Sequence, residues 1–440
     1  MLKIIHHRKS MPDRTIIFGR FPVPGKTKTR LIPELGIVGA ADFQRRLTEK
    51  IFATVQAVAH LNRAMDVEFC FTDGSSAQMR RWLGRRPVLT PQVQGDLGKR
   101  MQTALAQAFH AGCRRVVLLG TDIPGLRVEH LNEAFHALRN HDLVLGPSKD
   151  GGYWLIGLKQ PLNLFQDIQW DSPEVLEQTL SIAAQKGLKI HQLQPLMDMD
   201  SFEDIKAHAS EWIRTSPYLS VVIPALNEEK NISTTIKNIR DRDAEIIVVD
   251  GGSTDHTVER ASQAGARVVK SPKGRAIQLN AGAAEAKGVI LLFLHADTLL
   301  PKDYVAQIFE ALMNAKVVAG AFRFKTTLQH PLMKAIECMA NLRSRFLHLP
   351  YGDQGLFIKK ALLGELGGFP EVPIAEDLFM VRRINKRGRI GILPSYAVTS
   401  ARRWQTLGLI RTTLINQIIL AGCFLGISPA KLAPLYRVRS

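Results

Sequence analysis

The chain has 440 residues, of which 45% are hydrophobic and 22% charged, and its formal net charge is +18. This composition is close to that of ordinary globular proteins and excludes a mostly disordered chain and a polytopic membrane protein. The length favours two domains of roughly 200 residues each. Four cysteines lie far apart without a Cys-x-x-Cys pair, and residues 1–10 contain no long apolar core. We therefore expect no disulfide scaffold, no zinc ribbon and no signal peptide, which favours a cytoplasmic protein.

The first half of the chain alternates short apolar runs with helical stretches, a pattern typical of a mostly parallel α/β sheet. The apolar runs predict buried strands at Thr15–Arg20, Val67–Thr72, Val116–Gly120 and Leu143–Gly146. Apolar residues spaced three to four apart predict helices at Ala40–Leu61 and Leu97–Ala111.

A loop of glycines, prolines and cations follows the first strand, and it contains Gly25, Lys26, Lys28 and Arg30. Three cations within five positions can clasp a triphosphate, although the spacing is not that of a Walker loop. Asp122 and Asp150 each follow a later strand, at the edge where open α/β sheets bind ligands. These two carboxylates are candidates to share one Mg²⁺.

With these motifs and Gln169-Trp-Asp-Ser172, residues Thr15 to Leu193 resemble the DUF2064 proteins, relatives of the sugar-phosphate and cofactor nucleotidyltransferases. The resemblance implies a GT-A-like sheet with a nucleotide site at the cationic loop, Asp122 and Asp150. Such a domain would bind or make a nucleotide-activated compound. A non-catalytic domain that is kept for assembly is the alternative, because a fold alone does not confer a function.

The second half begins after the linker-like segment Thr215-Ser216-Pro217, so we expect the domains to comprise residues 1–215 and 216–440. Apolar runs predict strands at Ser220–Pro224, Glu245–Asp250, Val289–His295 and Val317–Phe324. Helical spacing predicts helices at Asn231–Arg240, Thr257–Ala264 and Tyr304–Asn314. As in the first half, strands alternate with helices, and an aspartate, Asp297, follows an apolar run.

Taken in order, the motifs between Tyr218 and Arg403 resemble those of the family 2 glycosyltransferases, which have the GT-A fold. They are Val222-Ile-Pro-Ala-Leu-Asn-Glu, Val249-Asp-Gly-Gly-Ser-Thr-Asp, Gly274-Arg-Ala with Asn280, Leu294-His-Ala-Asp297, Gly352-Asp-Gln-Gly and Glu376-Asp377. The resemblance implies that one group of residues binds the nucleotide sugar: Pro224, Asn227, Glu228, Asp250, Arg275, Asn280 and Asp297. It also implies that Asp377, with Glu376 beside it, is the catalytic base for the acceptor hydroxyl.

The resemblance further implies that Asp297 binds a divalent cation, Mg²⁺ or Mn²⁺, which neutralises the departing nucleoside diphosphate. The usual family motif has an aspartate two residues earlier, where this chain has His295. An imidazole suits softer ions better than Mg²⁺. His295 as a second metal ligand therefore makes Mn²⁺ a fair candidate.

Within family 2, the chain looks closest to the arsenosugar-biosynthesis-like branch, a label that does not show that arsenic is involved. This likeness is carried by Tyr351-Gly-Asp-Gln-Gly-Leu-Phe, Gly367-Gly-Phe-Pro and Thr399-Ser-Ala-Arg-Arg-Trp404. It implies that the acceptor side is formed by Asp353, Gln354, Arg403 and Trp404. For Trp404, simple packing in the core is the alternative.

The last part of the chain, Leu378 to Ser440, contains eleven basic residues and no acidic one. Such a field attracts phosphates, nucleoside diphosphates or anionic lipid headgroups, and a solvated basic tail is the alternative. Leu407–Ile427 is apolar but is interrupted by Arg411 and by Asn416-Gln417. We expect a helix that packs on its domain or lies in a membrane interface, through residues 402–440, rather than one that spans.

Together these patterns predict an α/β protein with two GT-A-like domains, each a mostly parallel sheet flanked by helices. We expect metal-dependent, inverting transfer of a sugar from a nucleotide sugar to an unidentified acceptor hydroxyl, with a lipid-linked acceptor and contact with the inner face of the cell membrane left open. A nucleotidyltransferase with a non-catalytic second domain is one alternative. A basic nucleic-acid-binding protein is another, but nucleic acid is not expected, because aromatic residues make up only 7% and no nucleic-acid motif is recognised.

Overall fold

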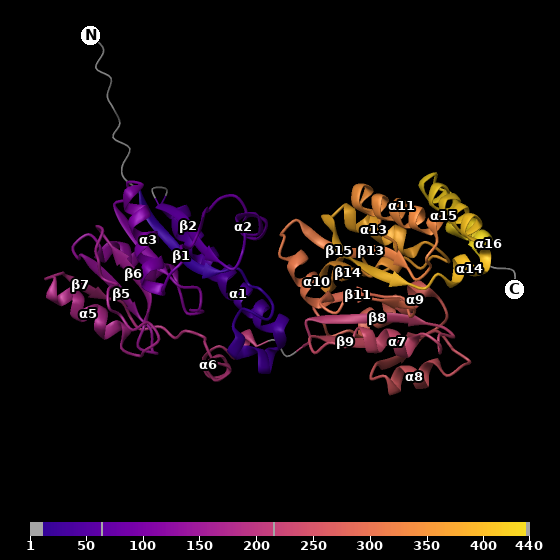
Figure 1. Ribbon diagram of the computed structural model, residues 1–440, viewed down its shortest axis with the longest axis horizontal. Coiled ribbons are helices and arrows are strands. Elements are labelled where there is room, and N and C mark those ends of the chain that lie inside the picture. Colours follow the sequence, from indigo (N-terminus) through magenta and orange to yellow (C-terminus); the bar gives the residue numbers. More distant parts are fainter. Residues whose placement is uncertain (1–11, 63–64, 214–215, 437–440) are drawn as a thin grey trace, which may run out of the picture. The chain divides into compact units, whose positions relative to one another are not determined.

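The computed structural model describes residues 12–62, 65–213 and 216–436, and the chain divides into two compact units, Met1–Arg214 and Thr215–Ser440 (Figure 1). Residues 1–10, which we expect not to be a signal peptide, lie outside the described residues. Thr215 of the linker-like segment and residues 437–440 of the basic tail also lie outside them. Each unit is an α/β fold.

The N-terminal unit contains a sheet in the strand order β3-β2-β1-β4-β6-β5-β7. Its strands are β1 (Asp13–Arg20), β2 (Met65–Thr72), β3 (Val88–Pro91), β4 (Arg115–Leu119), β5 (Leu143–Pro147), β6 (Tyr153–Leu158) and β7 (Ile190–Gln192). All neighbours pair in parallel except β6, which runs antiparallel to both β4 and β5. The predicted, mostly parallel sheet is therefore confirmed, and β3, β6 and β7 are strands that the sequence analysis did not predict.

Helices flank this sheet, and their bounds are α1 (Ile32–Leu61), α2 (Ser76–Leu83), α3 (Leu97–His110), α4 (Val128–Ala137), α5 (Val175–Gln185) and α6 (Phe202–His208), with 3-10 turns η1 (Thr29–Leu31) and η2 (Ser210–Trp212). The predicted helix from Ala40 begins eight residues earlier than expected, and Gly36 (φ 76°) interrupts it. Helix α3 begins where expected because the Asp96 side chain accepts a hydrogen bond from the Lys99 backbone N–H at 2.7 Å.

The C-terminal unit contains a sheet in the order β10-β9-β8-β11-β14-β13-β15-β12. Its strands are β8 (Leu219–Ala225), β9 (Ala244–Asp250), β10 (Arg267–Lys270), β11 (Ile290–Phe293), β12 (Thr298–Leu299), β13 (Val317–Thr326), β14 (Leu356–Lys359) and β15 (Arg389–Thr399). Strand β14 runs antiparallel to β11 and β13, and β12 runs antiparallel to β15. Strand β11 ends at Phe293, two residues before the predicted end, so His295 and Asp297 lie in the loop after it.

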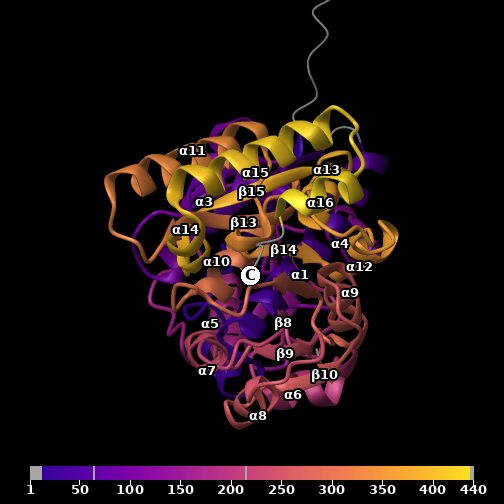
Figure 2. The same cartoon turned by 90° about the vertical axis from the view of Figure 1, so that its right-hand side faces the viewer.

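Helices also flank the second sheet: α7 (Ile232–Asn238), α8 (Thr257–Gln263), α9 (Arg275–Glu285), α10 (Tyr304–Leu312), α11 (Pro331–Leu347), α12 (Lys360–Glu365), α13 (Glu376–Asn385), α14 (Arg402–Leu407), α15 (Leu409–Phe424) and α16 (Pro429–Tyr436), with the 3-10 turn η3 (Gly352–Gln354). Most of the apolar segment Leu407–Ile427 forms α15, which contacts α11 at one edge of the unit (Figure 2). Within the described ranges, no helix is both long enough and apolar enough to cross a membrane.

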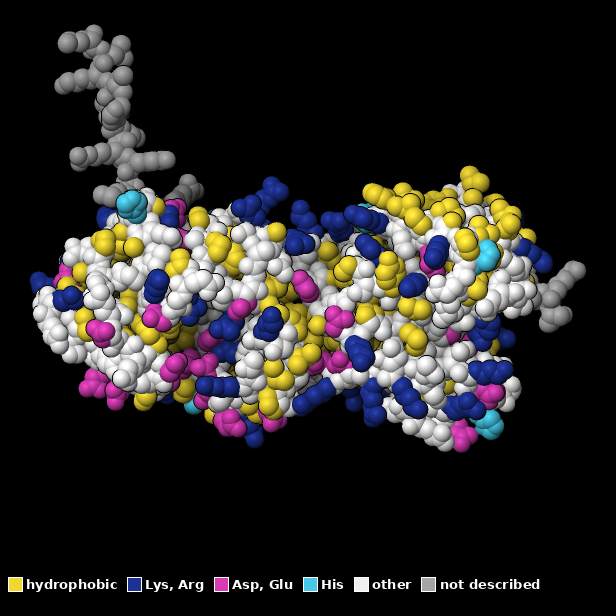
Figure 3. Space-filling model, viewed as in Figure 1, with side chains coloured by type: hydrophobic (Ala, Val, Ile, Leu, Met, Phe, Trp, Pro, Cys, Tyr) yellow, Lys and Arg dark blue, Asp and Glu magenta, His cyan; other side chains and the backbone are white. Residues whose placement is uncertain are grey.

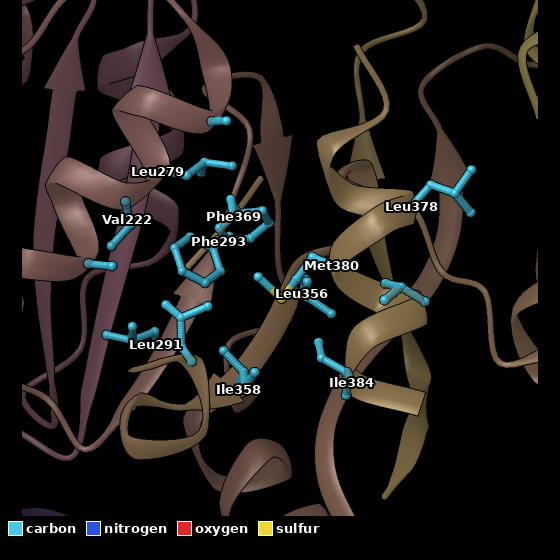
Figure 4. Packing of buried hydrophobic residues seen from close by; sticks show 14 of the residues in the cluster. Val222, Leu279, Leu291, Phe293, Leu356, Ile358, Phe369, Leu378, Met380 and Ile384 are labelled. Carbon is cyan, nitrogen blue, oxygen red and sulfur yellow. The ribbon is translucent and has the colours of Figure 1, made fainter. Parts of the chain in front are cut away.

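The core of the C-terminal unit joins the sheet to α9 and α13 (Figure 4). Phe293 of β11 packs edge-on against Phe369, with ring centroids 4.7 Å apart. Leu279 of α9 and Met380 of α13 enter the same cluster. Burying each such side chain stabilises the fold by roughly 1.5–3 kcal/mol. This core fixes the carboxyl ends of β8, β9 and β11 relative to the start of α13.

Candidate active site

Hydrogen bonds order the loops at the carboxyl ends of β8 and β9, some within the β9 loop and one between the two loops. The Asp250 carboxylate accepts from the backbone N–H groups of Gly252 and Ser253, at 3.0 and 3.1 Å. The Asn227 side-chain oxygen accepts from the Thr254 N–H at 2.9 Å, with Asn227 itself at φ 55°. Polar groups of the predicted nucleotide site are thus already ordered where parallel strands end.

Gln278 was not among the predicted site residues, yet it braces these strand ends. Its buried amide donates to the Ala225 and Val249 carbonyls at 2.9 and 2.8 Å, from its position on α9. Pro224 lies beside Val249 in the register of β8 and β9. The spacing of Gln278 on α9 was the only available signal, and nothing in the sequence alone connects it with two strand ends.

A cluster of carboxylates and one arginine lies at the end of β11. Arg402, at the start of α14, donates to Glu228 at 2.5 Å and lies 3.9 Å from Asp297. The Thr399 hydroxyl lies 3.4 Å from the other oxygen of Asp297. Burial, together with the charge of Glu228, raises the pKa of Asp297, and Arg402 opposes that shift. Glu228 and Asp297 were predicted from motifs, whereas Arg402 was not.

His295 lies near the η3 turn. Burial, helped by the charge of Arg275, lowers the pKa of His295 well below its usual value, so its imidazole is neutral at physiological pH. Its buried Nε2 atom has no hydrogen-bond partner among the described atoms. A side chain built at Gly352 would come within 3.1 Å of that nitrogen, so glycine keeps the space beside it open.

Glu376 and Asp377 begin α13, and their carboxylates make different contacts. Arg275 lies 3.1 Å from Glu376. Burial raises the pKa of Glu376, the positive charge of Arg275 opposes this, and Asp377 adds to it. Asp377 accepts from the backbone N–H groups of Gly352 and Leu378, both at 2.7 Å. Ala375, with φ 62°, occupies the N-cap position, so Asp377 is not the N-cap of this helix.

Asp353 lies in the η3 turn, directly after Gly352, whose N–H donates to Asp377. Burial raises the pKa of Asp353 to about 6, the charge of Asp377 adds to the shift, and Arg343 opposes it. The Arg343 guanidinium stacks 3.4 Å from the centroid of the Tyr351 ring. A carboxylate with a pKa near 6 is well suited to accept a proton near neutral pH.

One cavity of about 380 Å³ brings most of these groups together. Its lining includes Arg275, His295, Asp297, Asp353, Glu376, Asp377, Arg403 and Trp404. A second cavity of about 350 Å³ lies beside it, and the two share Tyr351, Asp353, Trp404, Asn416 and Leu420. Trp404 packs against Phe324 at 5.8 Å, while its indole N–H has no partner among the described atoms. The structure thus joins motifs from five separate parts of the second half.

Two predicted site residues have their polar groups engaged within the fold. Asn280 donates to the Phe369 carbonyl at 2.9 Å and accepts from its N–H at 2.8 Å. Gln354 is buried, donates to the Phe322 carbonyl, and accepts from Ser344 and from the Tyr351 N–H. Both side chains hold the loops that carry the cavity residues.

The described residues contain no cluster of three or more His, Cys, Asp and Glu side chains arranged to hold a metal ion. Two donors are nevertheless available in the cavity, a carboxylate at Asp297 and a neutral imidazole at His295. The two provide the kinds of donor atom that Mn²⁺ binds in proteins.

The N-terminal unit has its own cavity, of about 340 Å³, at the end of β4, and Asp122 is in its lining. Lys28 (φ 48°) reaches into this region and pairs with Asp122 at 3.2 Å and with Asp200 at 2.7 Å. Burial lowers the pKa of Lys28, but the two carboxylates outweigh it and the net shift is upward. Gly25, Lys26 and Arg30 of the same loop are exposed.

Asp198 and Asp200 are acidic residues of this region that sequence reasoning missed. Burial raises the pKa of Asp198 to about 6, and the charges of Asp150 and Asp200 add to the shift. Asp150 itself lies in the β5–β6 turn, three residues after β5 ends, where it accepts from Ser148 at 2.5 Å. The alternation Met197-Asp198-Met199-Asp200 before the capping residue Ser201 was the available signal.

Comparisons with known proteins agree with both halves of the sequence pattern. Residues 54–172 match the family described as an uncharacterized protein conserved in bacteria (DUF2064), and residues 220–361 match glycosyl transferase family 2. YdaM of Bacillus subtilis (strain 168), described as a probable glycosyltransferase, is 29% identical over 206 residues, which cover 40% of this chain and 49% of YdaM.

Glucosyl-3-phosphoglycerate synthase of Mycobacterium tuberculosis (strain CDC 1551 / Oshkosh) is 38% identical over 96 residues, covering 19% of this chain and 30% of that enzyme. The chain thus spans about half the length of YdaM and less than a third of the synthase. A crystal structure from Desulfovibrio desulfuricans G20, provisionally assigned as a nucleotide-diphospho-sugar transferase, is 31% identical with a TM-score of 0.43, and it covers 47% of this chain and 90% of that one. The chain is a fusion of a DUF2064 domain, found at residues 54–172, with a glycosyl transferase family 2 domain, found at residues 220–361.

Proposed function

We propose that the C-terminal unit transfers a glycosyl group from a nucleoside-diphosphate sugar to an acceptor hydroxyl. The observation that carries this proposal is that Asp297, Asp353 and Asp377, far apart in the sequence, line one cavity of about 380 Å³. Glycosyl transfer needs charge compensation at the departing diphosphate and a base at the incoming hydroxyl, and both must face the same sugar. The match to glycosyl transferase family 2 and the similarity to YdaM support this assignment.

In this proposal the nucleoside lies against the carboxyl ends of β8 and β9. Asn227, Glu228 and Asp250 would contact it from the two loops, with Pro224 fixing the end of β8. Arg275, in the first turn of α9, would approach the diphosphate, whose charge also suits the N–H groups at that helix start. Asn280 would act by holding the loop at Phe369 in place.

A divalent cation, Mg²⁺ or Mn²⁺, would be held by Asp297 and His295. The fit is supported by the unpartnered, neutral imidazole nitrogen of His295, which favours Mn²⁺. When bound, such a cation neutralises the charge that accumulates on the departing diphosphate. Arg402 already compensates part of the charge of Glu228 and Asp297.

Asp377 would take the proton from the acceptor hydroxyl, with Glu376 beside it, and attack from the opposite side of the sugar would invert its configuration. Asp353 is a second candidate for the base, because its pKa of about 6 suits proton transfer near neutral pH. Arg403 and Trp404 line the same cavity and would contact the acceptor. Gln354 would position Asp353 and Tyr351 through its hydrogen bonds.

The N-terminal unit would bind or make a nucleotide-activated compound at the cavity beside Asp122. Lys28 and Asp200 lie next to Asp122, and Asp150 lies within electrostatic reach of Asp198. Lys26 and Arg30, exposed on the loop that begins at Gly25, would approach the phosphates of a nucleotide. The two units would then supply and consume the same class of molecule. Peripheral membrane contact through residues 402–440 is also part of the proposal.

Calorimetric titration of the full chain with a panel of UDP- and GDP-sugars, with and without Mn²⁺, tests the assignment. Asp297→Ala should weaken the Mn²⁺-dependent binding step at least tenfold, whereas Asp122→Ala, in the other unit, should leave the affinity of that same step unchanged. Glu285→Ala, an exposed position at the far end of α9, is the matched control. Equal affinity of wild type and Asp297→Ala in the presence of Mn²⁺ would remove Asp297 from the proposed site.

A further inference from the structure

The outer face of α11 and α15 carries large hydrophobic side chains that the fold leaves exposed (Figure 3). On α15 these are Ile410, Leu414 and Ile418, each more than half exposed and spaced four residues apart on one stripe. On α11 the most exposed is Phe346, at 67%. Most large exposed hydrophobics among the described residues lie on α11, α15 and the segment directly after α15. A contiguous apolar patch of this kind marks an interaction surface.

A basic groove runs along α11, and the exposed Leu342 of that helix belongs to its lining. This cavity, of about 570 Å³, is lined by Arg323, Lys334, Arg345 and Arg389. Glu337 is the acidic residue in its lining, and its carboxylate accepts from the Thr326 backbone N–H and hydroxyl at 2.7 and 2.8 Å. Lys334, Arg345 and Arg389 are exposed, so positive charge lies beside exposed apolar side chains of α11, the combination by which amphipathic surfaces bind anionic lipid.

The cavity between α11 and α15 connects this apolar face with the candidate active site. Ile336 and Ala340 of α11 line one side, and Gln417 of α15 lines the other. Asp353 and Trp404 belong both to this cavity and to the one that contains Asp297 and Asp377. An apolar chain lying between the two helices would therefore bring an attached polar head to the carboxylates.

We propose that the face of α11 and α15 docks on an anionic lipid bilayer, and that a lipid-anchored acceptor enters the active site through the cavity between these helices. The acceptor part rests on the proposed glycosyl transfer, whereas the docking part deepens the proposed membrane contact and does not depend on glycosyl transfer. A second copy of the chain fits less well, because a symmetric pair would bring the same basic groove of both copies to one interface.

Co-sedimentation with vesicles tests the docking directly. The full chain should bind vesicles of phosphatidylcholine with 30% phosphatidylglycerol at least tenfold more tightly than vesicles of phosphatidylcholine alone, about the preference expected from several basic residues at an anionic surface. Leu414→Asp/Ile418→Asp and, separately, Lys334→Glu/Arg345→Glu should each reduce this binding at least tenfold. Leu61→Asp and Arg85→Glu/Arg86→Glu, exposed positions in the N-terminal unit, are the matched controls.

Equal binding to both kinds of vesicle, or equal loss in the control variants, would overturn the proposal. The proposal would also be overturned if the wild type did not bind vesicles but formed a dimer in light scattering, and if the Leu414→Asp/Ile418→Asp variant were a monomer. Nucleotide-sugar affinity, measured on the same variants in solution, should stay unchanged. If no variant and no wild type binds nucleotide sugars but vesicle binding behaves as expected, the proposed function fails and the docking surface stands.

The path of the acceptor has a separate readout. A phosphatidylglycerol with a photoreactive diazirine in its acyl chain should label α11 and α15 next to the shared cavity. Ala340→Trp, which fills that cavity, should reduce this labelling severalfold without changing vesicle binding. Labelling confined to the outer stripe, and unaffected by Ala340→Trp, would leave the acceptor to enter by another route and refute this part.

Discussion

The two units share one sheet topology but surround it with different elements. Strands β3-β2-β1-β4-β6-β5-β7 correspond in order and direction to β10-β9-β8-β11-β14-β13-β15, and β12 is an addition at the second edge. In both units, an aspartate follows the strand that pairs with the first strand of the unit. Asp122 follows β4, which pairs with β1, and Asp297 follows β11, which pairs with β8. In both, a cation from a distant segment compensates it, Lys28 in one unit and Arg402 in the other.

The two units differ in the segments attached to the shared sheet. The C-terminal unit adds α13 to α16 and the long α11, which supply Asp377, Trp404 and the apolar face. The N-terminal unit ends with the short α6 and η2, and its acidic residues Asp198 and Asp200 precede α6 directly. The equivalent aspartates at the strand ends of the two units thus have different neighbouring residues. This indicates that the chemistry of each unit depends on the segments attached to the sheet rather than on the sheet itself.

The largest effect that separates the units should come from a core substitution. Phe293→Ala removes a buried ring that packs on Phe369, and such deletions destabilise by about 3–5 kcal/mol. Scanning calorimetry should show a lower melting transition for the C-terminal unit and an unchanged one for the N-terminal unit. Phe346→Ala, at an exposed position, should change neither. A joint shift of both transitions would mean that the units unfold as one.

The next effect concerns the base in the C-terminal unit. Asp377→Asn keeps an acceptor oxygen for only one of the N–H groups of Gly352 and Leu378 and cannot take a proton, so transfer should fall about 100-fold or more. Nucleotide-sugar affinity should remain within a few-fold, as measured by titration.

Asp353→Asn is the comparison variant for that experiment. If Asp353 were the base, the rate of wild type would rise with pH until about pH 6, following its raised pKa, and then level off. In that case Asp353→Asn would be the slow enzyme and Asp377→Asn would retain near wild-type turnover.

A smaller effect should come from Asp198 in the N-terminal unit. Its folded pKa of about 6 lies above the usual aspartate value, so the folded state binds the proton more tightly and stability falls as pH rises from about 4 to 6. Asp198→Asn removes this cost and should stabilise the unit by about 1 kcal/mol at pH 7.5, after allowance for its partial exposure, and by almost nothing at pH 4.

Asp200→Asn should act in the opposite direction. Burial raises the pKa of Asp200, but Lys28 outweighs it and the net shift is downward. The stability it contributes is present above the ordinary aspartate pKa and is lost as pH falls through the lower, folded value. Urea unfolding of both variants at the two pH values checks the pair of signs, and equal signs at pH 7.5 would contradict this electrostatic account.

The smallest effect is expected when the two units are separated, since their stability should not change. Fragments 1–214 and 216–440 should each fold alone, because each contains a complete sheet with its own core. Circular dichroism should give melting temperatures close to those of the two transitions in the full chain. If either fragment is insoluble and gains structure only when mixed with the other, the units are not independent.

Local sequence pattern predicted β1, β2, β4, β5, β8, β9, β11 and β13, because buried strands are short apolar runs, but it missed β3, β7, β10 and β15, which also pair in parallel. It also predicted the carboxylates beyond their ends, since Asp122 and Asp297 come directly after such runs. The antiparallel strands β6 and β14 were also missed, because apolar runs as short as Tyr153–Leu158 and Leu356–Lys359 are ambiguous from periodicity alone.

Local sequence pattern could not predict contacts between segments that are far apart in the sequence. The pairing of Arg402 with Glu228 joins two residues separated by 174 positions, and Lys28 with Asp200 joins residues separated by 172. Family resemblance placed Asn280 and Gln354 near the site, but the structure was needed to find their side chains bonded to the backbone. The motif thus identifies the neighbourhood of a residue more surely than its contacts.

The arginine on the strand-end carboxylates also changes what a measured cation affinity means. Arg402 donates to Glu228 and stands 3.9 Å from Asp297, so the free protein already has an internal counterion at these oxygens. Any divalent cation that binds there enters an exchange equilibrium, in which part of its attraction is offset by the guanidinium it displaces or repels. Titration would report an exchange constant, and Arg402→Gln would reveal the intrinsic one.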